Sequence, residues 1–161
     1  MDNHRELLCL NILGYKKPGI SDEDYRQYMI NVHGPLVGSL MEKYGFVSWN
    51  MTHNTAKTRG LMQNIFDPQF ANIAQYDSCI QIVFPDIECF VRMKADPFFR
   101  EKVGPDHENF ADTKASQMTI GWFAEILSEG KMAEAKPKPG LVPDAGQNVE
   151  KTPSEIYCGE L

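Results

Sequence analysis

The stretch LLCLNILGYKKPGISDEDYRQYMINVHGPLVGSLMEKYG, residues 7–45, joins two patterns that together decide the fold. Its beginning, residues 7–15, is short and apolar and ends at a Pro-Gly turn, which predicts a β-strand. Ser21 then offers an N-cap hydroxyl, and the acidic residues that follow it offset the helix dipole. Apolar side chains recur at helical spacing from there to Gly45, so a long amphipathic helix follows the strand.

The dipeptide Gly34-Pro35 interrupts this predicted helix. A proline inside a helix removes one backbone hydrogen bond and clashes with the preceding turn, so the helix axis bends. The distortion falls beside His33. Two interpretations stay open: the bend is a packing accommodation, or it holds an imidazole at the edge of a cavity.

Three further strands are predicted from short, largely apolar runs: residues 46–54, 76–84 and 118–126. Residues 55–74 follow no such period, apart from a possible helical turn, and so long a connection suggests a lid or a wall. A helix begins at Asp86, places Lys94 on its apolar face and restarts at Asp96-Pro97; residues 104–110 look like a turn that opens a short helix. The order βαββαβ predicts a ferredoxin-like α+β fold.

Composition and charge restrict the class of protein. With 161 residues, 42% of them hydrophobic, we expect one domain over residues 1–130, followed by an extended or disordered tail over residues 131–161 that is rich in Lys, Pro, Glu, Ala and Gly. The net charge of −6 argues against a nucleic-acid partner. No apolar stretch is long enough to span a membrane and the N-terminus is too polar for a signal peptide, so we expect a cytoplasmic protein.

The predicted sheet also bears on oligomeric state. Two helices cover only one face of a four-stranded sheet, and in the second and fourth strands both sets of alternating side chains look apolar, with Trp49 opposed to Phe46 and Trp122 opposed to Phe123. A second copy of the chain is the simplest cover for the free face. We therefore predict a homodimer.

Histidines are the candidate proton-transfer groups, because imidazole exchanges protons near neutral pH. His33 lies at the predicted bend, His53 ends the second strand and His107 lies in the turn within residues 104–110, whereas His4 lies in a polar extension. We predict that the first three converge on one pocket, although each could instead be a structural histidine. A metal site is disfavoured because no HxH or HxxxH spacing and no CxxC pair occurs, so no metal is expected.

Side chains around these histidines are candidates for substrate binding. Asp106 and Asn109 flank His107 and could orient its ring, although capping of the short helix is the favoured role of Asp106. Tyr15, Tyr28 and Trp49 could form flat apolar walls for an aromatic ligand, together with Phe66, Tyr76 and Trp122. No GxGxxG, Walker or GxSxG motif occurs, which excludes the usual nucleotide cofactor sites and a serine acyl-enzyme, and no cofactor is expected.

Several motifs resemble the EthD-domain family of the dimeric α+β barrel superfamily. They include Lys17-Pro18-Gly19, residues 31–37, residues 49–54, residues 67–71, residues 90–97 and residues 105–113, and the resemblance spans about residues 7–130. Within the family, the chain resembles a fungal subgroup of aromatic polyketide clusters, similar to the decarboxylases acting on atrochrysone carboxylic acid. The resemblance implies a dimeric barrel, no metal, and loss of carbon dioxide from a tricyclic hydroxy-keto acid.

On this basis His33, His53 and His107 are expected to be catalytic, and the substrate to be a small polyketide acid. Decarboxylation without a cofactor needs a carbonyl in the substrate as electron sink, so one protonated histidine would donate a hydrogen bond to that carbonyl and another would protonate the carbon. Two alternatives remain: a dehydratase or cyclase on a related polyketide, and a non-catalytic module that binds one.

Overall fold

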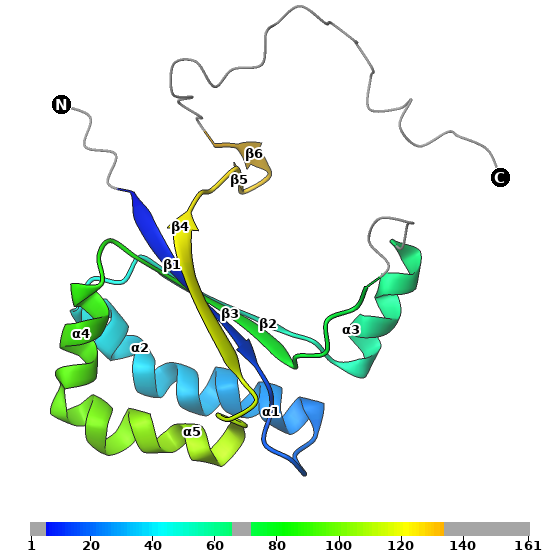
Figure 1. The fold of residues 1–161 in the computed structure, drawn as a ribbon, viewed down its shortest axis with the longest axis horizontal. Coiled ribbons are helices and arrows are strands. Elements are labelled where there is room, and N and C mark those ends of the chain that lie inside the picture. The colour runs from blue at the N-terminus through cyan, green and yellow to red at the C-terminus, as the bar shows by residue number, and fades with distance from the viewer. Residues whose placement is uncertain (1–5, 66–71, 134–161) are drawn as a thin grey trace, which may run out of the picture. The chain divides into compact units, whose positions relative to one another are not determined.

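The fold is a single antiparallel sheet with helices on one of its faces (Figure 1). A computed structural model of the chain describes residues 6–65 and 72–133. The sheet has the order β2-β3-β1-β4, and its strands are β1 (Leu7–Gly14), β2 (Ser48–His53), β3 (Ser78–Phe84) and β4 (Gln117–Phe123). Together with the helices between the strands, this order confirms the predicted ferredoxin-like α+β fold.

Two long helical segments lie against the sheet (Figure 1). The first is an α-helix that widens into one π-helical turn and continues as a second α-helix, whereas the second is interrupted at Asp96 before its π-helical turn and its final α-helix. The first segment comprises α1 (Asp22–Tyr28), the π-turn Met29–His33 and α2 (Gly34–Lys43). The second comprises α4 (Glu88–Ala95), the π-turn Phe99–Val103 and α5 (Gly104–Phe110).

Local signals in the sequence explain where these helices begin and restart. Ser21 caps α1, since its side chain accepts a hydrogen bond from the Asp24 amide at 3.0 Å. Asp96 leaves the helical conformation at the end of α4 and accepts from the Phe98 amide at 2.8 Å, which starts the next helix. Hydrogen bonds to Asp96 from Tyr44, Lys43 and that amide hold its pKa at about 2. The predicted start at Ser21 and restart at Asp96 are both confirmed.

The bend predicted at Gly34-Pro35 takes the form of the first π-turn. The Gly34 amide donates to the Met29 carbonyl, five residues back, so the turn widens just ahead of Pro35. The second segment repeats this device, with the Gly104 amide donating to the Phe99 carbonyl ahead of Pro105. The wide turn ends at His33 in the first segment, as the sequence interpretation expected.

Some predicted boundaries are wrong. The helical turn considered for residues 61–65 is confirmed as a 3-10 turn, Leu61–Asn64. The helix before it, α3 (Ala56–Gly60), was missed, because it starts at a capping box of Thr55 and Thr58 that sequence periodicity does not reveal. The last strand of the sheet ends at Phe123 and not at residue 126.

A short hairpin of β5 (Leu127–Ser128) and β6 (Lys131–Met132) follows as part of a separate unit, turning through Glu129 and Gly130 at positive φ. The predicted start of the tail falls at this turn. Residues 134–161 lie outside the described residues, so the tail stays a prediction. No helix within the described ranges is long and apolar enough to cross a membrane.

The two faces of the sheet differ in chemistry. The inner face packs its apolar side chains, such as Ile80, Ile82 and Phe84, against the helices. On the outer face four polar side chains lie in register across all strands: Asn50, Gln81, Asn11 and Thr119. The expectation that both sets of alternating side chains are apolar in the second and fourth strands is therefore wrong for their outer sets, which include Asn50 and Thr119. Phe46 lies before β2 and packs in the core, so its side chain does not belong to the outer face that the alternating pattern assigned to it.

Candidate active site

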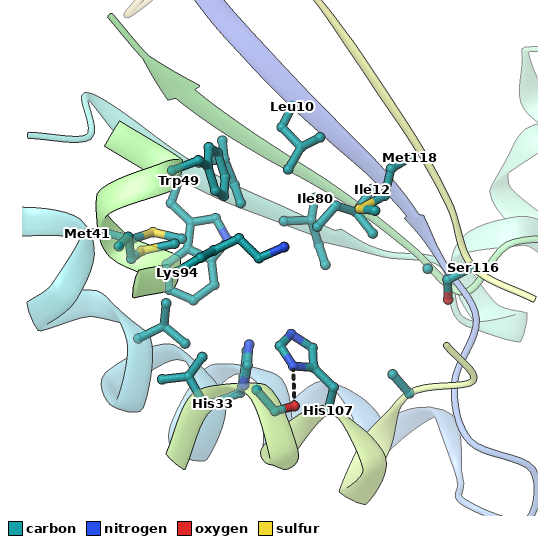
Figure 2. A pocket seen from close by; sticks show the side chains of 18 of the residues that line it. Leu10, Ile12, His33, Met41, Trp49, Ile80, Lys94, His107, Ser116 and Met118 are labelled. Atoms are coloured by element: carbon teal, nitrogen blue, oxygen red, sulfur yellow. Dashed lines mark hydrogen bonds between the residues drawn. The ribbon is translucent and has the colours of Figure 1, made fainter. Parts of the chain in front are cut away.

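A cavity of about 740 Å³ lies between the inner face of the sheet and the helices. Figure 2 shows Leu10, Ile12, Ile80 and Trp49 above it and His33 and His107 below it. Its lining is mostly apolar, and its volume falls in the range of about 300–1,000 Å³ that small-molecule pockets have. The cavity can enclose a polycyclic ligand and presents it to two imidazoles.

His33 is held from behind by a carboxylate. It is only 5% exposed, and its Nδ1 lies 2.8 Å from Oδ2 of Asp106. Asp106 is fixed in turn, because its Oδ1 accepts hydrogen bonds from the Tyr28 hydroxyl at 2.5 Å and from the Asn109 amide at 3.0 Å. A carboxylate accepts the Nδ1 proton, so the Nε2 of His33 keeps its lone pair for the cavity.

His107 has the same tautomer through a different partner. Its Nδ1 lies 3.0 Å from the carbonyl oxygen of Gly104, drawn as the dashed line in Figure 2. Because a carbonyl only accepts, Nδ1 carries the proton and Nε2 is the reactive nitrogen. The ring centroids of His33 and His107 are 4.9 Å apart, so the two imidazoles form a pair at one wall of the cavity.

Burial and hydrogen bonds set the charges of His33 and Asp106. Loss of hydration and the neighbouring His107 lower the pKa of His33, against the hydrogen bond that His33 donates to Asp106, which raises it. For Asp106, burial alone would raise the pKa, but the hydrogen bonds from Tyr28, Asn109 and His33 outweigh it and the pKa lies below its usual range. Asp106 is therefore a carboxylate and His33 a neutral base near pH 7.

Trp49 adds a hydrogen-bond donor to the site. It lines the cavity, and its ring meets His33 edge-on at a centroid distance of 6.2 Å. Its Nε1 is buried and has no hydrogen-bond partner among the described residues. A buried donor left unpaired costs about 1–3 kcal/mol. The role of Trp49 in substrate binding stays a prediction.

His53 is not among the residues that line this cavity. Its ring packs edge-on against Tyr25 at 5.7 Å, and neither ring nitrogen has a hydrogen-bond partner within the described part of the chain. Burial, followed by the charge of Arg26, lowers the pKa of His53. The predicted convergence of three histidines is wrong for His53, and a catalytic role for it stays a prediction.

The other predicted binding residues divide into two groups. Tyr28 and Asn109 donate hydrogen bonds to Asp106 and do not line the cavity. Tyr15 does not line it either, and its backbone amide donates to the Ser116 hydroxyl. Asp106 orients His33 and makes no cap for α5, which corrects the favoured interpretation of this residue. The Asp106–His33 contact joins residues 73 positions apart, so no local pattern could reveal it.

Of the aromatic residues proposed as further walls, the two that the structure describes do not enclose the cavity. Trp122 is 72% exposed, Tyr76 is not among the lining residues, and Phe66 lies outside the described residues. Sequence reasoning did not assign Lys94, which lines the cavity with its ammonium directed inward (Figure 2). The available signal was its position on the apolar face of α4.

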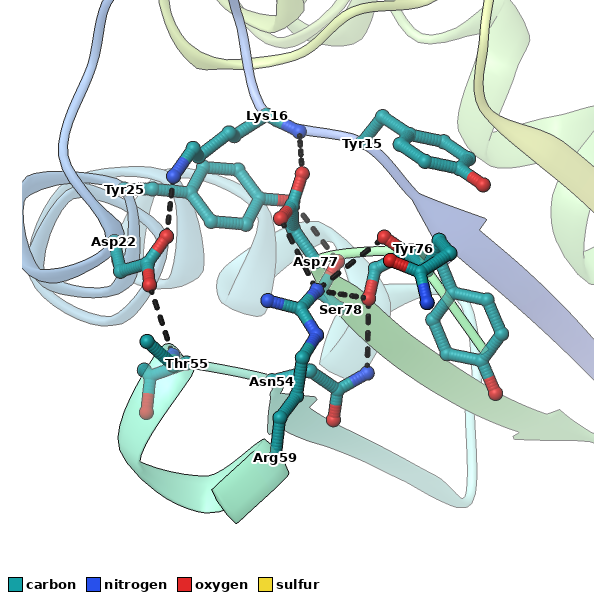
Figure 3. A network of polar contacts seen from close by, with 12 residues as sticks. Tyr15, Lys16, Asp22, Tyr25, Asn54, Thr55, Arg59, Tyr76, Asp77 and Ser78 are labelled. Carbon is teal, nitrogen blue, oxygen red and sulfur yellow. Dashed lines mark hydrogen bonds and ion pairs between the residues drawn. The ribbon is translucent and has the colours of Figure 1, made fainter. Parts of the chain in front are cut away.

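A second polar cluster stabilises the end of the sheet beside α3 (Figure 3). Lys16 pairs with Asp22, and its backbone amide donates to Asp77 at 2.9 Å. Arg59 of α3 also reaches Asp77, at 3.4 Å. These contacts join the β1–α1 connection to α3 and to the start of β3, and they involve no group of the cavity.

Within residues 6–65 and 72–133, no cluster of three or more His, Cys, Asp or Glu side chains could hold a metal ion.

Comparisons with known proteins agree with this architecture. The family model for the EthD domain matches residues 17–114. The chain is 62% identical over 135 residues to Dehydratase ustZ of Ustilaginoidea virens, covering 84% of this chain and 96% of that one. It is 54% identical over 127 residues to Decarboxylase claH of Passalora fulva, covering 79% of this chain and 82% of that one.

Solved structures resemble the chain more distantly. An EthD-family protein from Bacillus halodurans is 16% identical, with a TM-score of 0.48 over 72% of this chain and 96% of that one. SnoaB, a cofactor-independent oxygenase from Streptomyces nogalater, is 12% identical, with a TM-score of 0.44 over 79% of this chain and 99% of that one.

Proposed function

The chain belongs to the EthD-domain family, and from this membership and the geometry of its cavity we propose that it is a lyase that removes water from a polycyclic aromatic polyketide. The observation that carries the proposal is the pair of imidazoles at one wall of the cavity, with Asp106 behind His33. Elimination of water needs one group that takes a proton and a second that gives one, and this pair can supply both.

The proton transfers balance over the two rings. The Nε2 of His33 takes a proton from the carbon next to a substrate carbonyl, and the electrons of that C–H bond form the new double bond. The proton then passes from His33 to the Nε2 of His107, whose ring centroid is 4.9 Å away. The C–O bond to the neighbouring hydroxyl breaks, His107 gives this proton to the leaving oxygen, and water departs, which leaves both imidazoles neutral.

The substrate carbonyl becomes an enolate during proton removal and needs a donor in the cavity. The unpaired Nε1–H of Trp49 supports this role, because it is buried beside His33 and has no other acceptor among the described residues. A fixed donor in an apolar cavity stabilises developing negative charge more than water does. Trp49 is therefore the proposed oxyanion donor.

Decarboxylation is the second candidate. It is favoured by the likeness to Decarboxylase claH, and the same pair could donate to the electron-accepting carbonyl and protonate the carbon. In that reaction the bond that breaks joins carbon to the carboxylate, and no proton is taken from carbon. Decarboxylation therefore needs no base in the bond-breaking step, whereas dehydration needs one, and His33 with Asp106 behind it can supply it.

Product mass separates the candidates. The purified chain is incubated with a polycyclic β-hydroxy ketone that also carries a carboxyl group. Loss of about 18 mass units supports dehydration, and loss of about 44 mass units supports decarboxylation. An unchanged ligand that binds tightly, with binding insensitive to replacement of His33 and His107, would indicate a non-catalytic binding module and contradict both candidates.

A further inference from the structure

Few of the side chains that line the cavity carry a formal charge, and those that do lie on two different helices. Among the described residues, Lys94 of α4 and Glu108 of α5 are the only ones that line it with a formally charged side chain. Both are exposed residues, so they mark the solvent side of the cavity. An apolar interior excludes an ionised group, and any charge on a ligand therefore has to stay at this side.

The side chain of Lys94 runs inward over the apolar wall (Figure 2). Two lysines of the described residues do pair with carboxylates, Lys43 with Asp96 and Lys16 with Asp22. Within the described residues the ammonium of Lys94 makes no ion pair, with Glu108 or with any other carboxylate. An unpaired cation that faces a ligand cavity can receive an anion from the ligand.

We infer that Lys94 binds a carboxylate of the substrate at the mouth of the cavity, while the rings of the substrate enter toward His33 and His107. This inference rests on the proposed function only in taking the cavity as the substrate site. It identifies the substrate class as a planar polycyclic acid. Glu108 repels the same carboxylate from the α5 side, which directs it to α4.

The position of the carboxylate also bears on the reaction. An ammonium that pairs with a carboxylate stabilises the ground state of the substrate. During decarboxylation the negative charge moves away from the carboxylate as carbon dioxide forms, so the ion pair is lost in the transition state. Lys94 therefore disfavours decarboxylation of the group it binds. The paired histidines act on a different part of the same molecule, and the carboxylate is retained in the product.

The test uses an unreactive probe, so that binding is measured apart from turnover. Anthraquinone-2-carboxylic acid and its methyl ester are titrated into the full-length chain, and the dissociation constants are read from quenching of tryptophan fluorescence. Lys94→Met weakens binding of the acid about two- to fivefold, as expected for a partly exposed ion pair, and leaves the ester unchanged. Lys94→Glu weakens the acid further, and Glu108→Gln tightens it.

Arg92→Met is the matched control, because Arg92 lies on the same helix and does not line the cavity. It should change neither titration. Equal weakening of acid and ester by Lys94→Met, an equal loss with Arg92→Met, or no binding of the acid to the unsubstituted chain overturns the inference. Turnover of the same preparations reports separately on the proposed function, since the probes do not react.

Discussion

The reactivity of individual side chains here depends on contacts that cross the fold. His33 and His107 could be chosen from the sequence because imidazole suits proton transfer. The role of Asp106 could not, since the carboxylate reaches His33 from another helix. His53 looked equivalent in sequence, yet its strand places it against Tyr25 instead of at the cavity.

Replacing the histidines singly tests this division. His33→Ala and His107→Ala should each lower turnover by about 10²- to 10⁴-fold, the usual contribution of a general acid or base. His53→Ala is the matched control and should keep turnover within about threefold, because His53 does not line the cavity. Steady-state kinetics with circular dichroism of each variant gives the comparison. A large loss in His53→Ala with an intact fold would contradict it.

The pH dependence of turnover tests the role of Asp106. His33 acts as a base only when neutral, so activity is present above its pKa and is lost as the pH falls through it. That pKa is lowered, mainly by burial, and the acidic limb should therefore lie below pH 6.5. Asp106 raises the pKa of His33, so Asp106→Asn should reduce turnover and move this limb to still lower pH. A limb that stays in place would show that Asp106 does not act through His33.

At the scale of elements, the two π-turns position the catalytic helices. The sequence predicted a bend at Pro35 but not its form, because the i to i+5 hydrogen bond depends on which carbonyl the widened backbone reaches. Cap residues such as Ser21 and Asp96 were readable, since their signals are local. The ends of the strands were harder to predict from the sequence, because the pairing partner decides where a strand ends.

Two glycines of the first helical segment offer a matched pair for the π-turn. A Cβ at Gly34 would lie 3.1 Å from the Met29 carbonyl oxygen, whereas a Cβ at Gly38 would meet nothing within 4 Å. Gly34→Ala should lower both the melting temperature and turnover, because widening the turn further displaces His33. Gly38→Ala should stabilise the fold by about 0.4–1 kcal/mol. Thermal melts and kinetics decide this, and equal behaviour of the two variants would contradict it.

At the scale of the whole molecule, an apolar row on β4 is left uncovered. Met118, Ile120 and Trp122 share the inner face of this edge strand and are 70%, 49% and 72% exposed. The sequence argument for a homodimer relied on an apolar outer face, which instead carries a polar row with Gln81 bonded to Asn11 at 3.0 Å. The homodimer stays a prediction, and its expected contact moves to the β4 row.

The mass in solution tests this expectation. At micromolar concentration the chain should have about twice its mass of 18.3 kDa by light scattering. Trp122→Asp should shift the population toward the monomer, whereas Thr119→Asp, on the opposite face of the same strand, should not. Dissociation by Thr119→Asp alone would place the contact on the outer face, and a monomeric unsubstituted chain would contradict the homodimer itself.

The most direct test of the account follows the proton that His33 is proposed to remove. A tricyclic ketone that lacks the leaving hydroxyl is incubated with the protein in deuterium oxide, and proton NMR follows the carbon next to the carbonyl. The account predicts enzyme-catalysed exchange of that hydrogen for deuterium, lost in His33→Ala and retained in His53→Ala. No exchange above the rate without protein, or exchange that persists in His33→Ala, would contradict it.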